Sequence, residues 1–249
     1  VQNTFIGGLA GDAATTASNN TAVGYAALTT NTTGTQNTAL GAYAGDAITT
    51  GNHNIATGAF ALGANTTGSY NVAIGRSSLE ANTTASNNTA VGNHALLANT
   101  TGAENTATGS NSQLATTTGN YNTSNGSGSL YANTTGSSNV AIGLNALVAN
   151  TTASNNTAVG TFALTANTTG ARQTSVGARS GMQNTTGNYN AFFGYDAGES
   201  NTTGSSNTAL GDSSLRETTT GASNTAVGQS ALLANTTGTS NVAVGSLAG

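Results

Sequence analysis

Apolar and polar residues follow one another along this chain with a constant period of 17 residues. The consensus of one period is N-T-A-V-G-x-x-A-L-x-A-N-T-T-G-x-x. Asparagine opens each period, with Gln173 as the one replacement, and glycine follows four residues later in every period. No insertion or deletion interrupts the pattern between Asn3 and Gly245. The pattern therefore predicts a single repeat array over residues 1–249, without a linker or a second domain.

A unit of 17 residues is too short for the helical repeats, which need about 33 residues or more. Two segments of each period are typical of strands: Thr-Ala-Val before the first glycine, as in 21–23, and Ala-Leu-x-Ala-Asn-Thr-Thr before the second, as in 61–67 and, with Thr30 for the second Ala, in 27–33. Alanine replaces the second glycine at Ala17, Ala85 and Ala153, where a corner needs little side-chain volume. We expect an all-β fold, a parallel β-solenoid or β-roll of about 15 coils, with equivalent residues stacked about 4.8 Å apart. The constant asparagine predicts a ladder of side-chain amides along the stack.

Comparison of equivalent positions separates the inner from the outer residues. The position shared by Tyr25, Ala42 and Arg76 varies freely and is expected to be solvated. Adjacent residues of a strand face opposite sides, so Ala22 and Val23 cannot share a face, yet both positions are restricted in size. A strand restricted on both faces is buried on both, which favours a homo-oligomer. A thin monomer is the alternative.

The composition excludes several classes of function. Only 5% of the residues are charged, against about 25% in an average soluble protein, and the chain has no Lys and a net charge of −4. We therefore expect no nucleic-acid partner. The absence of Cys removes disulfides, zinc fingers and thiol catalysis. No apolar run approaches 18 residues, so no membrane insertion by this segment is expected. The chain begins at Val1 and its one methionine is Met182, which indicates a mature chain or a fragment with any targeting signal outside it.

Candidate catalytic chemistry is sparse. Asp12 and Asp46 share one position of the repeat but lie two coils apart, at about 10 Å. Asp196 and Asp212 are the nearest approach to a carboxylate pair, and we interpret them as unrelated surface acids. We therefore expect no enzyme, and no catalytic, cofactor-binding or metal-binding residue, while the ligand-binding residues stay unknown. Two histidines stand at different variable positions and are expected to be solvated: His53 and His94.

Three segments carry a resemblance to known proteins: residues 71–75, 139–143 and 241–245, which read N-V-A-I-G or N-V-A-V-G. They resemble the N/S-V-A-I-G repeat of trimeric autotransporter adhesin heads, and similar N-T-A-V-G repeats of bacteriophage tail fibres. The resemblance implies a left-handed parallel β-roll, trimerised about a fibre axis. The period of this chain is longer than the usual unit of the adhesin heads, through its additional Asn-Thr-Thr segment.

The resemblance also implies a function and a location. It predicts a structural and binding protein, a segment of an extracellular fibrous adhesin or phage tail fibre that projects a recognition surface. The expected partners are two further copies of the chain, forming a homotrimer, and a host-surface glycan or protein receptor. The expected location is a cell-surface fibre or a virion tail fibre.

The threonine pair of each period leaves an alternative function open, because ice-binding solenoids display ranks of outward threonines. Those ranks need Thr-x-Thr, since alternate residues share a face of a strand. Here the pair is adjacent, as in Thr100-Thr101, so one hydroxyl is expected to point inward and one outward. The alternative is a monomeric ice-binding solenoid that uses its outward threonine rank.

Two zones depart from the consensus. Polar residues replace Val and Leu in the first zone, at Thr108, Gln113 and Asn125. In the second zone, we expect large side chains to fill the space left by a missing Leu. The second zone contains Phe192, Phe193, Tyr195 and Gly198.

Overall fold

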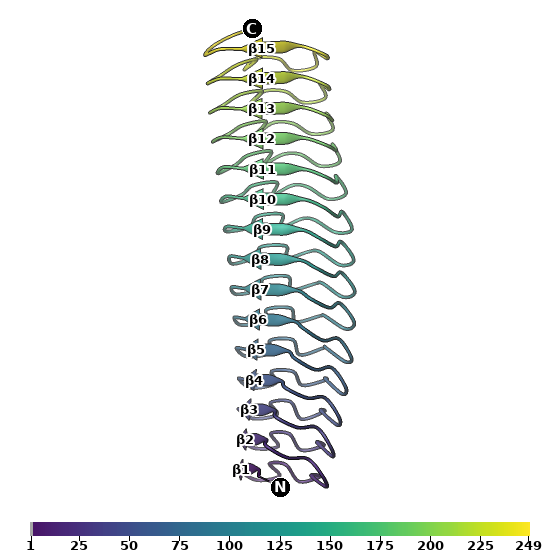
Figure 1. The fold of residues 1–249 in the computed structure, drawn as a ribbon. Coiled ribbons are helices and arrows are strands. Elements are labelled where there is room, and N and C mark those ends of the chain that lie inside the picture. The colour runs from purple at the N-terminus through teal and green to yellow at the C-terminus, as the bar shows by residue number, and fades with distance from the viewer. Residues whose placement is uncertain (1) are drawn as a thin grey trace. The chain divides into compact units, whose positions relative to one another are not determined.

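The computed structural model describes residues 2–249, which divide into two compact units at residues 122 and 123. Each unit is an all-β parallel solenoid with one short strand in each coil (Figure 1). The first unit contains β1 (Thr4–Ile6), β2 (Thr21–Val23), β3 (Thr38–Leu40), β4 (Ile55–Thr57), β5 (Val72–Ile74), β6 (Thr89–Val91) and β7 (Thr106–Thr108). The second unit contains β8 (Thr123–Asn125), β9 (Val140–Ile142), β10 (Thr157–Val159), β11 (Thr174–Val176), β12 (Ala191–Phe193), β13 (Thr208–Leu210), β14 (Thr225–Val227) and β15 (Val242–Val244). Residues 2–249 contain no helix.

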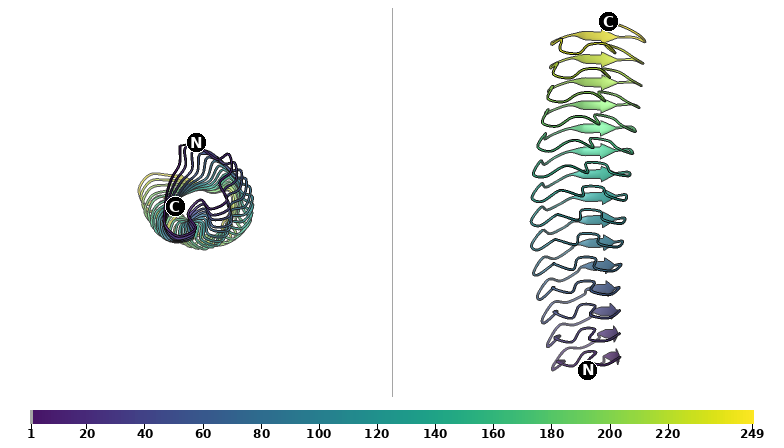
Figure 2. Two further views of the ribbon diagram at one scale, coloured as in Figure 1. Left: turned by 90° about the horizontal axis from the view of Figure 1, so that it is seen from below. Right: turned by 180° about the vertical axis from the view of Figure 1, so that it is seen from behind.

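The strands of each unit pair in sequence order and in parallel, always joining residues 17 positions apart. Thr21 pairs with Thr38 between β2 and β3, and Thr157 pairs with Thr174 between β10 and β11. Within a unit, successive coils follow nearly the same path when viewed along the stack (Figure 2). The predicted β-solenoid and its 17-residue register are thereby confirmed.

The prediction of a second strand in each period is wrong, because residues such as 27–33 form turns and bends. Leu28 has φ 50° and Ala26 has φ 56°, both in the left-handed region, which an extended strand does not contain. Hydrogen bonds between coils nevertheless continue through this segment, as from Leu28 N to Ala44 O at 3.1 Å and from Thr30 N to Asp46 O at 3.1 Å. The turns thus keep the inter-coil bonding while they close the coil.

Small and branched apolar side chains fill the interior of each coil. Ala22, Ala27 and Leu28 are fully buried, and their equivalents form the cores of both units. Of the large side chains in the second consensus-breaking zone, Phe193 and Tyr195 are exposed and Phe192 is buried. The expected compensation is therefore confirmed at Phe192, because a Cβ added to Gly198 would lie 2.7 Å from its ring. The ring occupies the space that Leu fills in other coils.

Two ladders of buried asparagines run along each unit. In the predicted ladder, Asn37 N donates to Asn20 Oδ1 at 2.8 Å, and Asn37 Nδ2 donates to the carbonyl of Gly51 at 2.8 Å. The second ladder uses the asparagine of the Asn-Thr-Thr segment: Asn82 Nδ2 donates to Asn65 Oδ1 at 2.9 Å. Buried amides are stable when they are bonded in this way, which explains why the position of the first ladder is constant apart from Gln173. The second ladder is interrupted where Ile48 and Thr116 replace the asparagine.

Candidate functional site

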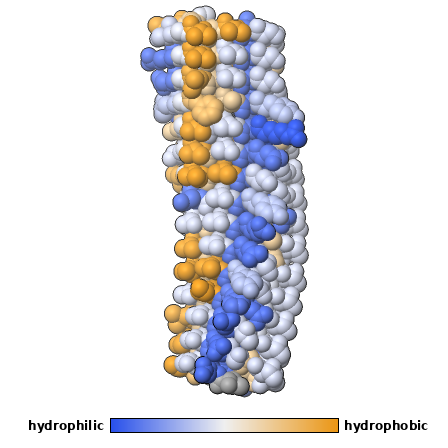
Figure 3. All heavy atoms as spheres, viewed as in Figure 1, coloured by the Kyte–Doolittle hydropathy of each residue, from blue (hydrophilic) through white to orange (hydrophobic). Residues whose placement is uncertain are grey.

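The outward face of the strands is a regular surface of each unit. Within each three-residue strand the central residue points inward and its two neighbours point outward, so Ala22 is buried while Val23 is only half-buried. The outward third position carries aliphatic side chains that are 40% to 71% exposed: Ile6, Leu40, Ile74, Ile142, Leu210 and Val244. These side chains form orange columns over the strands in both units (Figure 3). No part of residues 2–249 covers these side chains, although the residues at this position are restricted in size.

Polar residues interrupt this strand face where the first consensus-breaking zone falls. Thr108 of β7 is half-buried and Asn125 of β8 is exposed. Gln113 lies on the opposite side of the coil wall, fully buried, with its Nε2 donating to the carbonyl of Thr106 at 2.9 Å. The zone therefore changes both the outer face and the core.

The threonine pair of each coil divides as predicted. The hydroxyl of Thr83 donates to the carbonyl of Thr100 in the next coil at 3.1 Å, whereas Thr84 is exposed. Equivalent bonds repeat along both units, as from Thr151 to the carbonyl of Thr168 at 3.1 Å. Each unit thus presents one outward threonine rank beside one bonded rank.

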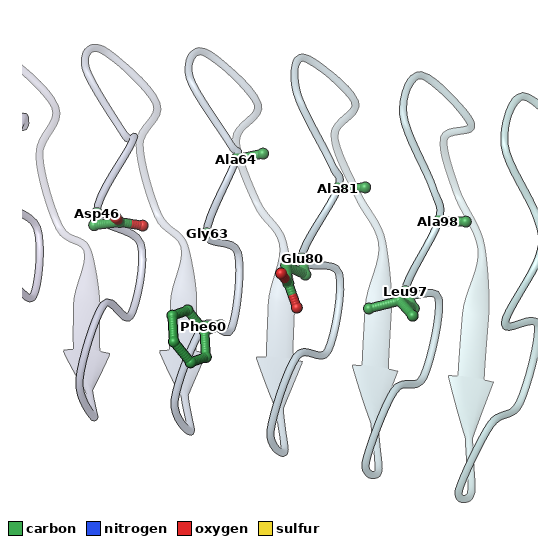
Figure 4. Close-up of a pocket in the computed structure, with 8 residues that line it drawn as sticks. All are labelled: Asp46, Phe60, Gly63, Ala64, Glu80, Ala81, Leu97 and Ala98. Atoms are coloured by element: carbon green, nitrogen blue, oxygen red, sulfur yellow. The ribbon is translucent and has the colours of Figure 1, made fainter.

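A groove of about 530 Å³ lies on the turn side of the first unit (Figure 4). Asp46 and Glu80 lie on the two coils that flank Gly63, and all three occupy the same position of the repeat. Burial raises the pKa of Asp46, with a further contribution from the negative charge of Glu80, while hydrogen bonds from the backbone act against both. The two carboxylates therefore face a shared space.

Apolar and aromatic side chains complete the groove. Its other lining residues are Phe60, Ala64, Ala81, Leu97 and Ala98. The exposed ring of Phe60 stacks on Tyr43 with 5.3 Å between ring centroids and 4° between planes, and Tyr43 in turn meets Tyr25 edge to face. This groove was not predicted from the comparison of Asp12 with Asp46. The signal for it in the sequence is Gly63, which stands between two acids, Asp46 and Glu80, at the same position of the repeat.

A second charged cluster lies in the other unit. Asp196 and Glu199 are buried beside Arg179 and Arg216: Arg179 Nε lies 3.2 Å from Asp196 Oδ1, Arg216 Nε lies 3.0 Å from Glu199 Oε2, and Arg179 also pairs with Glu199. Burial acts to raise the pKa of Glu199, but the hydrogen bonds from both arginines outweigh it and lower that pKa. Burial and the charge of Glu199 raise the pKa of Asp196 in spite of the arginines.

This cluster corrects the interpretation of Asp196 as a surface acid, while its supposed companion Asp212 is exposed. Opposite charges recur 17 residues apart, from Arg179 to Asp196 and from Glu199 to Arg216, and this spacing is the signal that could have found them. Because each acid is matched by an arginine, the cluster ties three coils together and leaves no free charge for a ligand.

The two histidines differ in their surroundings. His53 is exposed, as expected, and its ring stacks on Tyr70 at 4.8 Å between centroids. His94 is half-buried and its Nε2 lies 3.0 Å from Nη1 of Arg76. Among residues 2–249, no group of three or more His, Cys, Asp or Glu side chains could hold a metal ion. In the same residues, no helix has the length and apolar character needed to cross a membrane.

Comparison of the chain with protein-family models, with curated proteins and with solved structures gave no match. The class that the structure defines is a repetitive parallel β-solenoid. Its surface offers an uncovered strand face in both units and one groove with two carboxylates in the first unit.

Proposed function

We propose that the chain is a structural and binding protein, a segment of an extracellular fibre in which three copies pack through their strand faces. The observation that carries this proposal is the strand face itself. Its aliphatic residues keep a restricted size in coil after coil, yet a single chain leaves them half-buried or exposed. Extended apolar surfaces of this kind mark protein–protein contacts.

The fibre would be a cell-surface adhesin or a virion tail fibre, with a host-surface glycan or protein as its receptor. The resemblance of residues 71–75 to adhesin-head repeats supports this reading, as does the hydrogen-bonded stacking of coils, which suits a load-bearing scaffold. Such a fibre works by projecting a recognition surface rather than by catalysis.

Light scattering coupled to size-exclusion chromatography tests the assembly. We expect the chain to elute with three chain masses. The double variant Ile74→Asp and Ile142→Asp should elute with one, because each new charge would be buried in the interface. The matched control, Thr84→Asp and Thr152→Asp, places two charges on the exposed threonine rank and should keep three masses. A wild-type chain that elutes with one mass at micromolar concentration contradicts the proposal.

A second candidate function is a monomeric ice-binding solenoid, and the exposed threonine rank that includes Thr67, Thr84 and Thr101 is the observation that favours it. The two candidates separate in an assay of ice recrystallisation. The fibre proposal expects no activity. Arrest of ice growth by micromolar wild type, abolished by lysine at these three positions, would establish the ice-binding function instead.

A further inference from the structure

The carboxylates of the groove lack a cationic partner. Within residues 2–249, every ion pair involves Arg179 or Arg216, so Asp46 and Glu80 take part in none. The one arginine of the first unit, Arg76, contacts His94 instead. Two half-buried negative charges in a chain with so few charges therefore stand unneutralised on one surface.

The space between these carboxylates is open because residue 63 has no side chain. A Cβ added to Gly63 would lie 3.6 Å from Asp46 Oδ1 and 3.8 Å from Glu80 Cγ, so both acidic side chains border the position that a larger residue would fill. Equivalent positions elsewhere hold large residues such as Leu97 and Tyr131. The missing side chain leaves a recess whose walls are acidic.

The rest of the recess is apolar and aromatic. Ala64, Ala81 and Leu97 line it and offer no polar side-chain atom, and Phe60 adds a ring that is 39% exposed. Divalent cations such as Ca²⁺ require six or more oxygen ligands, which this lining does not supply. The lining instead suits a cation that has an apolar stem and a flat, weakly hydrated head.

We propose that this groove binds the side chain of an arginine presented by a protein partner. The guanidinium would lie between the carboxylates of Asp46 and Glu80 and over the ring of Phe60, and the alkyl stem would cover the alanines and Leu97. Guanidinium groups form charge-assisted hydrogen bonds to carboxylates and stack on aromatic rings. The proposal is independent of the trimeric fibre, because the groove residues belong to the turns and not to the strand face.

The test uses n-butylguanidinium as the probe and n-butylurea as its neutral analogue. In protein labelled at the alanine methyl groups, we expect n-butylguanidinium to shift the NMR signals of Ala64, Ala81 and Ala98 with a dissociation constant in the millimolar range. We expect n-butylurea to leave them unchanged at the same concentrations. Equal shifts with both probes would show simple apolar contact and overturn the proposal.

Two kinds of variant separate charge from shape. Asp46→Asn and Glu80→Gln should each weaken binding about fivefold, as expected for a partly exposed ion pair. Gly63→Leu keeps both charges but fills the recess with the residue type found at Leu97, and it should abolish binding. Asp12→Asn is the matched control, since it removes an exposed carboxylate at the same repeat position outside the groove, and it should change nothing.

Two further outcomes would contradict the proposal. If Gly63→Leu, with an unchanged spectrum outside the groove, binds the probe as wild type does, the attraction is diffuse and the recess is not a site. If Ca²⁺ alone shifts the same alanine signals at submillimolar concentration while n-butylguanidinium does not, the carboxylates form a metal site. Neither result would bear on the strand-face assembly, which is measured by mass.

Discussion

At the residue scale, Gly160 shows why the residue that follows every strand is glycine. Its φ is 141°, a conformation that L side chains rarely adopt, and an added Cβ would lie 2.3 Å from the carbonyl oxygen of Gly177 in the next coil. A glycine repeated in every period predicts a positive φ or a close backbone contact, and the structure has both. The glycine is therefore required by the backbone and by the close approach of the next coil.

We predict that Gly160→Val lowers the free energy of unfolding by about 2–4 kcal/mol, from strain and overpacking. Thermal and chemical denaturation measure the change. The control is Thr161→Val, because Thr161 is the exposed neighbour at a freely variable position and its replacement should be nearly neutral. Equal midpoints for Gly160→Val and wild type would contradict the prediction.

The charged cluster gives a prediction for pH. A carboxylate whose pKa is lower in the folded state stabilises the fold above its ordinary value, 4.5 for Glu199, and loses that contribution as pH falls through the folded pKa. The raised pKa of Asp196 acts with the opposite sign, so it offsets part of the contribution of Glu199 at neutral pH.

Glu199→Gln should therefore destabilise the chain by about 1–2 kcal/mol at pH 7, a value reduced for the partly exposed arginines. The difference in stability between Glu199→Gln and wild type should become smaller below pH 4. Melting temperatures at pH 3, 5 and 7 measure it, with the exposed Glu217→Gln as control. A difference that stays constant across this range would show that the ionised form of Glu199 contributes nothing.

At the same scale, the contacts of the constant residues could be predicted from the sequence. The contacts between charged residues could be predicted only in part. A residue repeated every 17 positions predicts a ladder without knowledge of the coil path, as with Asn20 and Asn37. The pair Arg179 and Glu199 is different, because these residues occupy different positions of the repeat. They meet through left-handed turns that the hydrophobic pattern does not encode.

At the scale of the element, the three-residue strand was predictable and the turn segment was not. Thr-Ala-Val has the alternation and branching typical of strands, and it forms one in β2. The segment from Ala27 to Thr33 looks equally extended in sequence, but Leu28 adopts a left-handed conformation there. Burial of the Leu28 side chain and the hydrogen bonds between coils outweigh the preference of leucine for other backbone conformations. Both the burial and the bonds exist only once the coils are stacked.

The two threonine ranks should respond differently to valine. Replacing Thr49, Thr66 and Thr83 removes three hydroxyl bonds to the carbonyls of following coils, so we expect a loss of about 1.5–4.5 kcal/mol in total. Replacing Thr50, Thr67 and Thr84 removes exposed hydroxyls and should be nearly neutral. Urea denaturation compares the two triple variants. A larger loss from the second set would mean that the assignment of inner and outer ranks is wrong.

At the scale of the whole molecule, the 17-residue period predicts the stacking of coils within one chain, but it does not predict how several chains assemble. Constant spacing is visible in one chain because every pairing joins residues 17 apart. Whether the strand face is covered depends on a surface of another chain. A single chain shows only that Val23 and its equivalents are partly exposed to water. The groove also escapes the repeat pattern, because it is lined by Asp46, Gly63 and Glu80, which stand at a position that the consensus leaves open.

The constant register has a consequence for the gene. Within a unit each coil contacts its neighbours through the same ladders, so a duplication of 17 codons adds one complete coil and leaves every other pairing intact. A duplication of 16 or 18 codons would leave one coil a residue short or long, so that its strand and ladder residues would no longer match those of the neighbouring coil. Selection on such a gene would therefore allow the number of repeats to vary freely in steps of one coil, while it removes almost every shorter insertion or deletion.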